Sequence, residues 1–201
     1  MATKPMAIDV SKISITVNGY GVVNTNNVLK FVENEQLMLQ LVETQYGRKL
    51  LAETVKPHDS GDLVKNEGPS ALLLAVINFE SVALKLIETQ EGINLLVETR
   101  FDGRTILHAA VELYEKVALK LIEKEEGKNL LASTKENNTN WSSLHVAVNY
   151  HESVANKLTE TEDGIKLLSD TKDWTGASVL DLAKKAYPDI ALKFVNDIKR
   201  S

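Results

Sequence analysis

Cysteine is absent from the 201 residues of the chain. Without it the protein can form no disulfide, no thiolate nucleophile and no cysteine-ligated zinc site. Long hydrophobic runs are lacking too, because the longest, ALLLAVI at residues 71–77, is far too short to cross a bilayer. The N-terminal stretch MATKPMAIDVSK has no apolar core of the kind that a signal peptide needs. We therefore expect a soluble, cytoplasmic protein without membrane contact.

An excess of positive charge is also missing. Lysine and arginine number 23 against 28 aspartates and glutamates, which gives a formal net charge of -5. A nucleic-acid partner is disfavoured, because phosphate binding requires a concentrated basic face. The 43% hydrophobic content of a chain of this length suffices for one domain with a full core.

Motifs that carry known chemistry are absent as well. The chain contains no H-E-x-x-H sequence, no glycine-rich phosphate loop, no EF-hand loop and no nucleophile elbow. His58 lies beside Asp59 and Asp62 in a polar segment, where a metal site is conceivable, but a solvated loop is the favoured interpretation. We expect no catalytic residue, no cofactor and no metal.

The chain does contain an internal repeat. Four segments superimpose without a gap when their leucines Leu72, Leu107, Leu144 and Leu180 are aligned, at spacings of 35, 37 and 36 residues. They read GPSALLLAVINFESVALKLIE, GRTILHAAVELYEKVALKLIE, NWSSLHVAVNYHESVANKLTE and GASVLDLAKKAYPDIALKFVN. A weaker copy, NNVLKFVENEQLMLQLVET at residues 26–44, precedes them at an offset of 45.

Two columns of this alignment predict how the first helix of each copy begins. A glycine or asparagine precedes the hydroxyl residue by two positions, and both tolerate the positive φ of a sharp turn. The hydroxyl can accept a hydrogen bond from a free N–H of the first helical turn, which is the role of an N-cap. The turn column is Gly68, Gly103, Asn140 and Gly176, and the cap column is Ser70, Thr105, Ser142 and Ser178. Asp181 after Ser178 resembles the second half of a capping box.

Apolar residues then follow at helical spacing, from Leu107 and Val111 to Val117 and Leu121. A glycine with a leucine pair comes after each second helix, in the sequences GRKLL, GINLL, GKNLL and GIKLL. We expect the glycine to end the helix and the leucines to hold the connector under the stack. Each copy thus predicts a helix, a turn, a second helix and a long connector.

The repeat resembles the ankyrin repeat. GRTILHAA at residues 103–110 is similar to the G-x-T-P-L-H-x-A-A signature of that family, and SSLHVAV at 142–148 keeps the hydroxyl, leucine and histidine. GASVLDLAKKA at 176–186 is similar to the form often found in a last repeat. The resemblance covers residues 26–198. It implies a mainly α-helical, helix-turn-helix solenoid that binds other proteins.

The sequence departs from the ankyrin pattern in three ways. The proline after the hydroxyl is missing, and the period is longer than the usual value of about 33 residues. The glycine between paired helices is replaced by Phe79, Tyr114, His151 and Tyr187. A bulky side chain disfavours positive φ, so we expect Asn78 and Asn149, one and two residues earlier respectively, to adopt that conformation. An array of tetratricopeptide or HEAT type is the structural alternative.

The N-terminal residues predict a cap on the array. ISITVNGYGVV at 13–23 alternates apolar residues around Asn18 and Gly19, which is a hairpin signal. We expect a short β-hairpin or extended segment there, since a solenoid must cover its terminal apolar faces. The boundaries are residues 1–25 for the cap and 26–201 for the repeat domain, with repeats near 26–54, 68–99, 103–136, 140–172 and 176–198.

His108 and His145 share one column of the repeat, where other copies carry Leu73 and Asp181. A position that accepts leucine or aspartate is not an obligatory catalytic or metal-binding position. In the ankyrin family this histidine ties neighbouring turns together by hydrogen bonding, so the resemblance implies a structural role.

Aromatic residues collect at the turns and at the ends of the first helices. Trp141 follows the turn asparagine, where the counterparts are Pro69, Arg104 and Ala177, and these substitutions indicate an exposed site. Exposed aromatics on a rigid surface commonly anchor protein partners. We predict a partner-binding surface made of Phe101, Arg104, Glu112, Leu113, Trp141, Asn149, Tyr150 and Trp174.

The favoured function is a non-enzymatic module, monomeric when free, that binds another protein through its turn tips and first-helix surface. A regulatory or inhibitor subunit that blocks an enzyme is the alternative, and it would need the same surface. An enzyme or small-ligand sensor on an α-helical solenoid is disfavoured, because no convergent polar cluster is evident in the sequence.

Overall fold

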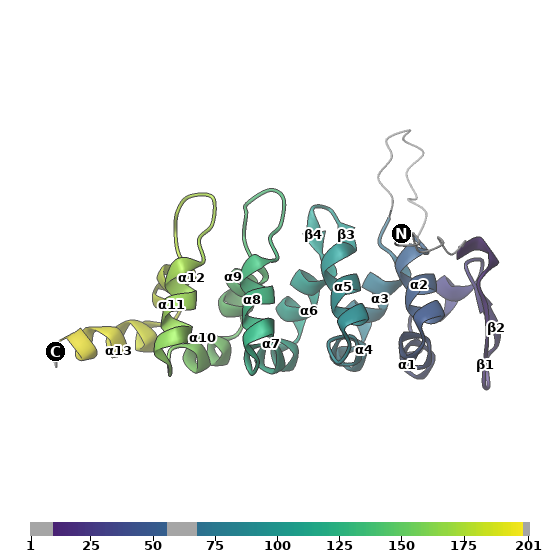
Figure 1. Cartoon of the computed structure of the whole chain (residues 1–201), viewed down its shortest axis with the longest axis horizontal. Coiled ribbons are helices and arrows are strands. Elements are labelled where there is room, and N and C mark those ends of the chain that lie inside the picture. The colour runs from purple at the N-terminus through teal and green to yellow at the C-terminus, as the bar shows by residue number, and fades with distance from the viewer. Residues whose placement is uncertain (1–9, 56–67, 199–201) are drawn as a thin grey trace, which may run out of the picture. The chain divides into compact units, whose positions relative to one another are not determined.

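The computed structural model describes residues 10–55 and 68–198. The described chain is mostly helical, and it divides into two compact units, Met1–Gly92 and Ile93–Ser201. Figure 1 shows the elements of both units. No described helix combines the length and the apolar character that a membrane span requires. The polar segment around His58, Asp59 and Asp62 lies outside the described residues.

The first unit begins with the expected hairpin. Strands β1 (Ser14–Val17) and β2 (Gly21–Asn24) pair antiparallel, with Ile15 opposite Val23 and Val17 opposite Gly21. Gly19 and Gly21 adopt positive φ angles of 84° and 76°, which the tight connection requires. The other elements of this unit are η1 (Val10–Lys12), η2 (Val28–Phe31), α1 (Glu35–Glu43), α2 (Gln45–Glu53), α3 (Ala71–Asn78) and α4 (Glu80–Leu86).

The first copy of the repeat lacks a full first helix. The four-residue 3-10 helix η2 stands in its place, while α1 is the second helix of the copy and packs against α4. At the offset of 45 residues, Asn27 falls in the column of the buried Leu72. A polar residue at that position removes the apolar anchor of the helix, and the Asn27 side chain instead bonds the hairpin.

Helix α5 (Gln90–Glu98) starts at the end of the first unit and continues into the second. The second unit contains three further copies of the repeat, of which the first two have three helices and the last has two, α12 and α13, within the described residues. Its elements are β3 (Arg100–Phe101), β4 (Arg104–Thr105), α6 (Ile106–Leu113), α7 (Glu115–Ile122), α8 (Glu125–Ser133), α9 (Ser143–Tyr150), α10 (Glu152–Leu158), α11 (Glu162–Asp170), α12 (Val179–Ala186) and α13 (Pro188–Ile198).

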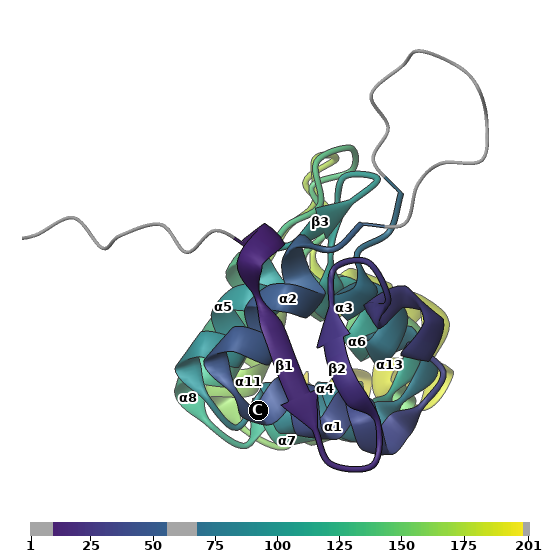
Figure 2. The ribbon, with the colours of Figure 1, turned by 90° about the vertical axis from the view of Figure 1, so that its right-hand side faces the viewer.

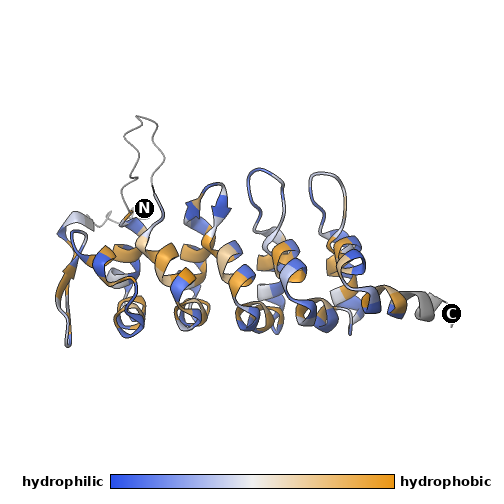
Figure 3. Cartoon of the chain, turned by 180° about the vertical axis from the view of Figure 1, so that it is seen from behind, coloured by the Kyte–Doolittle hydropathy of each residue, from blue (hydrophilic) through white to orange (hydrophobic). Residues whose placement is uncertain are grey.

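Equivalent helices of successive copies pack together in the second unit. α9 contacts both α6 and α12, and α10 contacts α7. The aligned leucines are buried as expected, with Leu107 and Leu144 fully inaccessible in this unit. The loops before α6, α9 and α12 project from the same side of these helices in Figure 1. Figure 3 colours these loops mainly hydrophilic, whereas the helices carry both hydrophobic and hydrophilic residues.

The connector of each of the first four copies proved to be a third helix, which contradicts the expected helix end at its glycine. Gly47 lies within α2 and Gly127 within α8, and both are buried. A Cβ on Gly47 would collide with the backbone of Leu41, and one on Gly127 with that of Leu121. The glycine is needed there because the third helix begins against the last turn of the second one.

The turn between paired helices also differs from the expectation. Asn78 and Asn149 are helical and do not adopt positive φ. The bulky residue that follows each first helix is extended instead, with φ of -129° at Tyr114 and -132° at His151. An extended conformation is open to any L-residue, so this turn needs no glycine. One residue ends the first helix and begins the second.

The predicted caps are present. Ser70 accepts from the Leu73 amide, and Ser142 and Ser178 each form a capping box with the third helical residue. In the turn column, Gly103, Asn140 and Gly176 adopt positive φ angles of 78°, 59° and 86°.

Candidate functional site

The eight residues of the predicted partner surface all lie in the second unit. Phe101 and Arg104 are on the short strands β3 and β4, and Trp141 and Trp174 are in the loops before α9 and α12. Helix ends carry the rest, with Glu112 and Leu113 on α6 and Asn149 and Tyr150 on α9.

Four of these residues expose large apolar side chains. Trp174 is 72% exposed, Tyr150 54%, Leu113 48% and Phe101 40%. Two of them end helices, one lies on a short strand and one in a loop; exposed apolar side chains suggest a surface for association where they form a contiguous patch. These four residues are called the apolar set below.

Trp141 was expected to be exposed, because Pro69, Arg104 and Ala177 occupy its position in the other copies, but the structure shows otherwise. Its indole ring stacks on the imidazole of His145, with ring centroids 5.8 Å apart and planes inclined by 21°. The side chain is half-buried. The counterparts Pro69, Arg104 and Ala177 gave no warning of this, because they have no ring that could stack. The Trp141 side chain therefore packs against α9 and stabilises the preceding loop, and it does not project into solvent.

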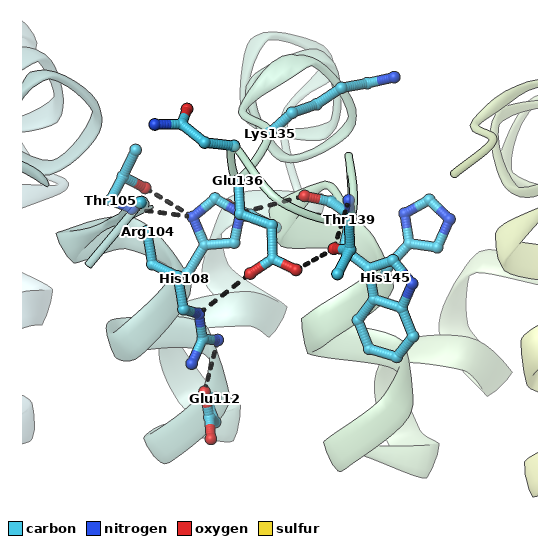
Figure 4. Close-up of polar contacts among 12 residues, drawn as sticks. Arg104, Thr105, His108, Glu112, Lys135, Glu136, Thr139 and His145 are labelled. Carbon is cyan, nitrogen blue, oxygen red and sulfur yellow. Dashed lines mark hydrogen bonds and ion pairs between the residues drawn. The ribbon is translucent and has the colours of Figure 1, made fainter. Parts of the chain in front are cut away.

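Arg104 is held between two carboxylates, as Figure 4 shows. Its Nη2 atom lies 2.6 Å from Oε2 of Glu112, and its Nε atom lies 3.4 Å from Oε2 of Glu136. Glu136 in turn accepts a hydrogen bond from the Thr139 hydroxyl. A hydrogen bond with Glu112 raises the pKa of the Tyr150 hydroxyl. The row from Glu136 to Tyr150 thus joins two successive copies and fixes the orientation of the guanidinium.

Sequence reasoning missed Glu136 as a member of this row. Glu136 lies nine residues after Gly127, as Phe101 lies nine residues after Gly92. This spacing puts Glu136 near the loop before α9, but only the three-dimensional structure shows that Arg104 of β4 reaches it.

The loops themselves are linked to one another. The Asn137 amide donates to the Gly103 carbonyl at 3.0 Å, and the Trp174 amide donates to the Thr139 carbonyl at 3.3 Å. The Lys135 ammonium bonds the Lys172 carbonyl at 3.3 Å. Main-chain bonds between neighbouring loops restrict their motion, so the aromatic residues on them are presented from a preorganised backbone.

His108 occupies a buried structural position. Its Nδ1 atom accepts from the Thr105 amide at 3.3 Å, which leaves the proton on Nε2 to be donated to the Trp141 carbonyl at 3.3 Å. Burial lowers the pKa of His108 to about 4, and it also lowers the pKa of His145. The tie that the ankyrin resemblance implied between neighbouring turns is therefore present at His108.

Within the described residues no cluster of three or more histidine, aspartate or glutamate side chains could hold a metal ion. Comparison with known families finds no family model that matches the chain, and no curated protein matches it either. The geometry of the second unit is therefore the main basis for a functional proposal.

Proposed function

We propose that the protein is a non-catalytic interaction module that binds a partner protein through the apolar set and the Arg104 row. In this proposal the copies form an ankyrin-like solenoid, and the free protein is a cytoplasmic monomer. The observation that carries it is the exposure of Phe101, Leu113, Tyr150 and Trp174 on linked loops and helix ends of one compact unit.

Aromatic side chains suit this role because they give a large contact area for few rotatable bonds. Tyr150 and Leu113 end their helices at equivalent positions, and α6 packs against α9, so the two belong to neighbouring copies. Arg104 and Glu112 supply charge whose geometry is already set before binding. Such charges favour a correct partner over a wrong one more than they add affinity.

The test begins with capture of partners by the tagged full-length protein and their identification by mass spectrometry. The decisive step compares Leu113→Ser with Leu192→Ser, the same change at an exposed leucine of α13. We expect Leu113→Ser to weaken binding at least about tenfold, because it removes apolar contact area. Leu192→Ser should bind like the unmodified protein.

Calorimetric titration of Tyr150→Ala and Trp174→Ala extends the test. Each should weaken binding by roughly 2 kcal/mol if it is an anchor. Equal affinity of all three variants and the unmodified protein would place the binding surface elsewhere. An activity assay of the captured partner, with and without the protein, separates a scaffold from an inhibitor.

A further inference from the structure

Thr139 lies at the centre of a set of hydrogen bonds in the loop before α9. Its hydroxyl group donates to the carboxylate of Glu136 and accepts from the amide of Trp141 at 3.1 Å. Its carbonyl accepts from the amide of Trp174, in the loop before α12, at 3.3 Å. One half-buried residue thus holds its own loop together and links it to the next loop.

Glu136 extends this set of bonds to Arg104. Its Oε1 atom receives the Thr139 hydroxyl, and its Oε2 atom lies 3.4 Å from Nε of Arg104, as Figure 4 shows. The Glu136 amide also donates to the Trp141 carbonyl at 2.9 Å, which closes the loop on itself. Both carboxylate oxygens of Glu136 are therefore engaged, so a shift of Thr139 would change how Arg104 is held.

The three loops that these residues join lie in a row within the second unit. Figure 1 shows the loops before α6, α9 and α12 one after another, and in the turned view of Figure 2 they lie one behind another. Arg104 belongs to the first of these loops, Thr139 to the second and Trp174 to the third. Thr139 therefore lies between the guanidinium of the Arg104 row and the 72% exposed indole of the apolar set.

A second loop threonine shows that such a set of bonds is not a general property of these loops. Thr175, in the loop before α12, also donates and accepts through its hydroxyl group. Its partners, the Asp173 carboxylate at 2.7 Å and the Ala177 amide at 3.3 Å, both lie in the same loop. The Thr175 hydroxyl thus shapes one loop, whereas Thr139 connects the groups that anchor Arg104 and Trp174.

We propose that Thr139 is a positioning residue of the partner surface, which fixes Arg104 and Trp174 relative to each other before the partner binds. This inference rests on the function proposed above and adds how its surface is kept in one arrangement. A hydroxyl group can donate and accept at the same time, so both bonds of Thr139 persist only while the loop keeps one conformation. Groups that are already ordered lose less conformational entropy on binding.

Three variants provide a matched comparison. Thr139→Val removes the hydroxyl group but keeps the branched shape, and Thr139→Ser keeps the hydroxyl group. Thr159→Val removes a hydroxyl group that donates to the Asn156 carbonyl at the end of α10, away from the loops. Circular dichroism checks that each variant folds. If Thr139→Val does not fold, Glu136→Gln replaces it, because this change removes the charge that attracts both the hydroxyl group and Arg104.

The first measurement needs no partner. NMR of the isotope-labelled full chain gives the hydrogen-exchange rate of the Trp174 amide. Thr139→Val should accelerate this exchange about tenfold, because the loss of one hydrogen bond changes an opening equilibrium by up to about that factor. Thr139→Ser and Thr159→Val should stay within about twofold of the unmodified protein. The Val148 amide in α9 reports the general stability of the unit, and it should respond equally to both valine variants.

A chain of contacts demonstrates coupling only when the coupling is measured, so the second measurement uses the partner captured in the test above. Calorimetry gives the affinities of Arg104→Gln, Trp174→Ala and the double variant, with and without Thr139→Val. We expect Thr139→Val alone to weaken binding about fivefold and Thr139→Ser to bind like the unmodified protein. With Thr139 present, the double variant should lose about threefold less affinity than the product of the two single losses. With Thr139→Val, the two losses should multiply, because each group is then positioned independently.

Three results would overturn the proposal. The first is an unchanged exchange rate of the Trp174 amide in Thr139→Val. The second is acceleration of the Trp174 and Val148 amides by the same factor, because Thr139 would then act only on general stability. The third is faster exchange at Trp174 with unchanged affinity for the partner. Each of these rejects only the role of Thr139, whereas equal affinity of Trp174→Ala, Leu113→Ser and the unmodified protein would reject the proposed function as well.

Discussion

The first copy of the repeat and the copies of the second unit begin their first helices differently. In the second unit, the Ser142 hydroxyl oxygen accepts a hydrogen bond from the His145 amide at 3.3 Å. The Ser142 amide in turn donates to Nδ1 of the His145 imidazole at 3.1 Å. In the first copy, Asn27 precedes η2 but makes no cap bond, because its side chain is bonded to the hairpin. An N-cap position therefore precedes the eight-residue helix α9 in the second unit, but only the four-residue 3-10 helix η2 in the first copy.

The difference teaches that a cap residue is effective only if its side chain is free to turn back onto the helix. Asn27 has a side chain of the right type for an N-cap. Its two bonds to Val22 and Asn24 use both the amide donor and the oxygen acceptor. The residue three positions later, Lys30, has no acceptor with which to complete a capping box.

The largest expected effect concerns the leucine column that the first copy lacks. Leu107→Ala in α6 should lower the free energy of unfolding by about 2–5 kcal/mol, since Leu107 is fully buried. Urea denaturation measures it, and tryptophan fluorescence reports on the second unit because both tryptophans lie there. The control is Leu113→Ala on the same helix, where exposure limits the loss to about 0.5 kcal/mol. Equal losses would mean that the column does not anchor the helix.

The second prediction concerns acid stability of the second unit. Burial lowers the folded pKa of His108 from 6.5 to about 4, so the unfolded chain binds the extra proton first. This contribution to stability is complete above pH 6.5 and falls as the pH is lowered from 6.5 to 4, by about 1.4 kcal/mol per unit. Over the whole window the loss is on the order of 3 kcal/mol.

His108→Leu tests this, because Leu73 occupies the same column in the first unit. The variant should be less stable at pH 7 but should lose less stability between pH 6.5 and 4. A slope remains from His145, whose pKa is also lowered. Urea unfolding at several pH values measures the slope, and an unchanged slope would mean that His108 does not titrate in this window.

The third prediction concerns a feature common to both regions. Gly127→Ala and Gly47→Ala should each destabilise the protein by about 1–3 kcal/mol, because the added methyl group meets the backbone of the preceding helix. Thermal unfolding followed by circular dichroism measures both. The control is Ala132→Gly, a change in the opposite direction within α8 at a half-buried site, which should cost about 1 kcal/mol or less. Tolerance of alanine at only one glycine would show that the third helices are not equivalent.

The smallest expected effect lies in the first unit. Asn27→Ala removes both bonds to the hairpin edge and should cost about 1 kcal/mol. Amide hydrogen exchange of Asn24 should accelerate, since its N–H loses its acceptor. The neighbouring change Asn26→Ala should have little effect, because Asn26 bonds the Asn24 side chain through its backbone amide, which alanine keeps. If the two variants exchange alike, the edge does not depend on Asn27.

Much of the fold could be predicted from local residue types. Ser142 and Ser178 were identified as caps from their place before an apolar helix, and Asn18 and Gly19 as a hairpin turn from the strands that flank them. The exposure of Trp174 and Tyr150 was also foreseen, because each lies at a loop or helix end. These features depend on a few consecutive residues, so their pattern is visible in the sequence.

The features that were missed depend on partners distant in sequence or on a choice between two roles for one residue. Glycine often ends a helix, and nothing in GKNLL shows that Gly127 faces the backbone of Leu121. The burial of Trp141 depends on the ring orientation of His145. Arg104 was expected at a partner surface, but its pairing with Glu136 needs the approach of the next loop.

Several bonds between copies of the second unit end on main-chain carbonyls. His151 bonds the carbonyl of Val111 at 2.8 Å, Tyr187 that of Val148 at 2.9 Å and His108 that of Trp141. A carbonyl is present whatever side chain the receiving residue carries, so mutation of that residue does not delete the acceptor. Selection on residue type therefore acts on the residue that donates from its side chain, and not on the residue that supplies the carbonyl. Drift of the receiving positions can erode recognisable sequence similarity while the copies stay joined.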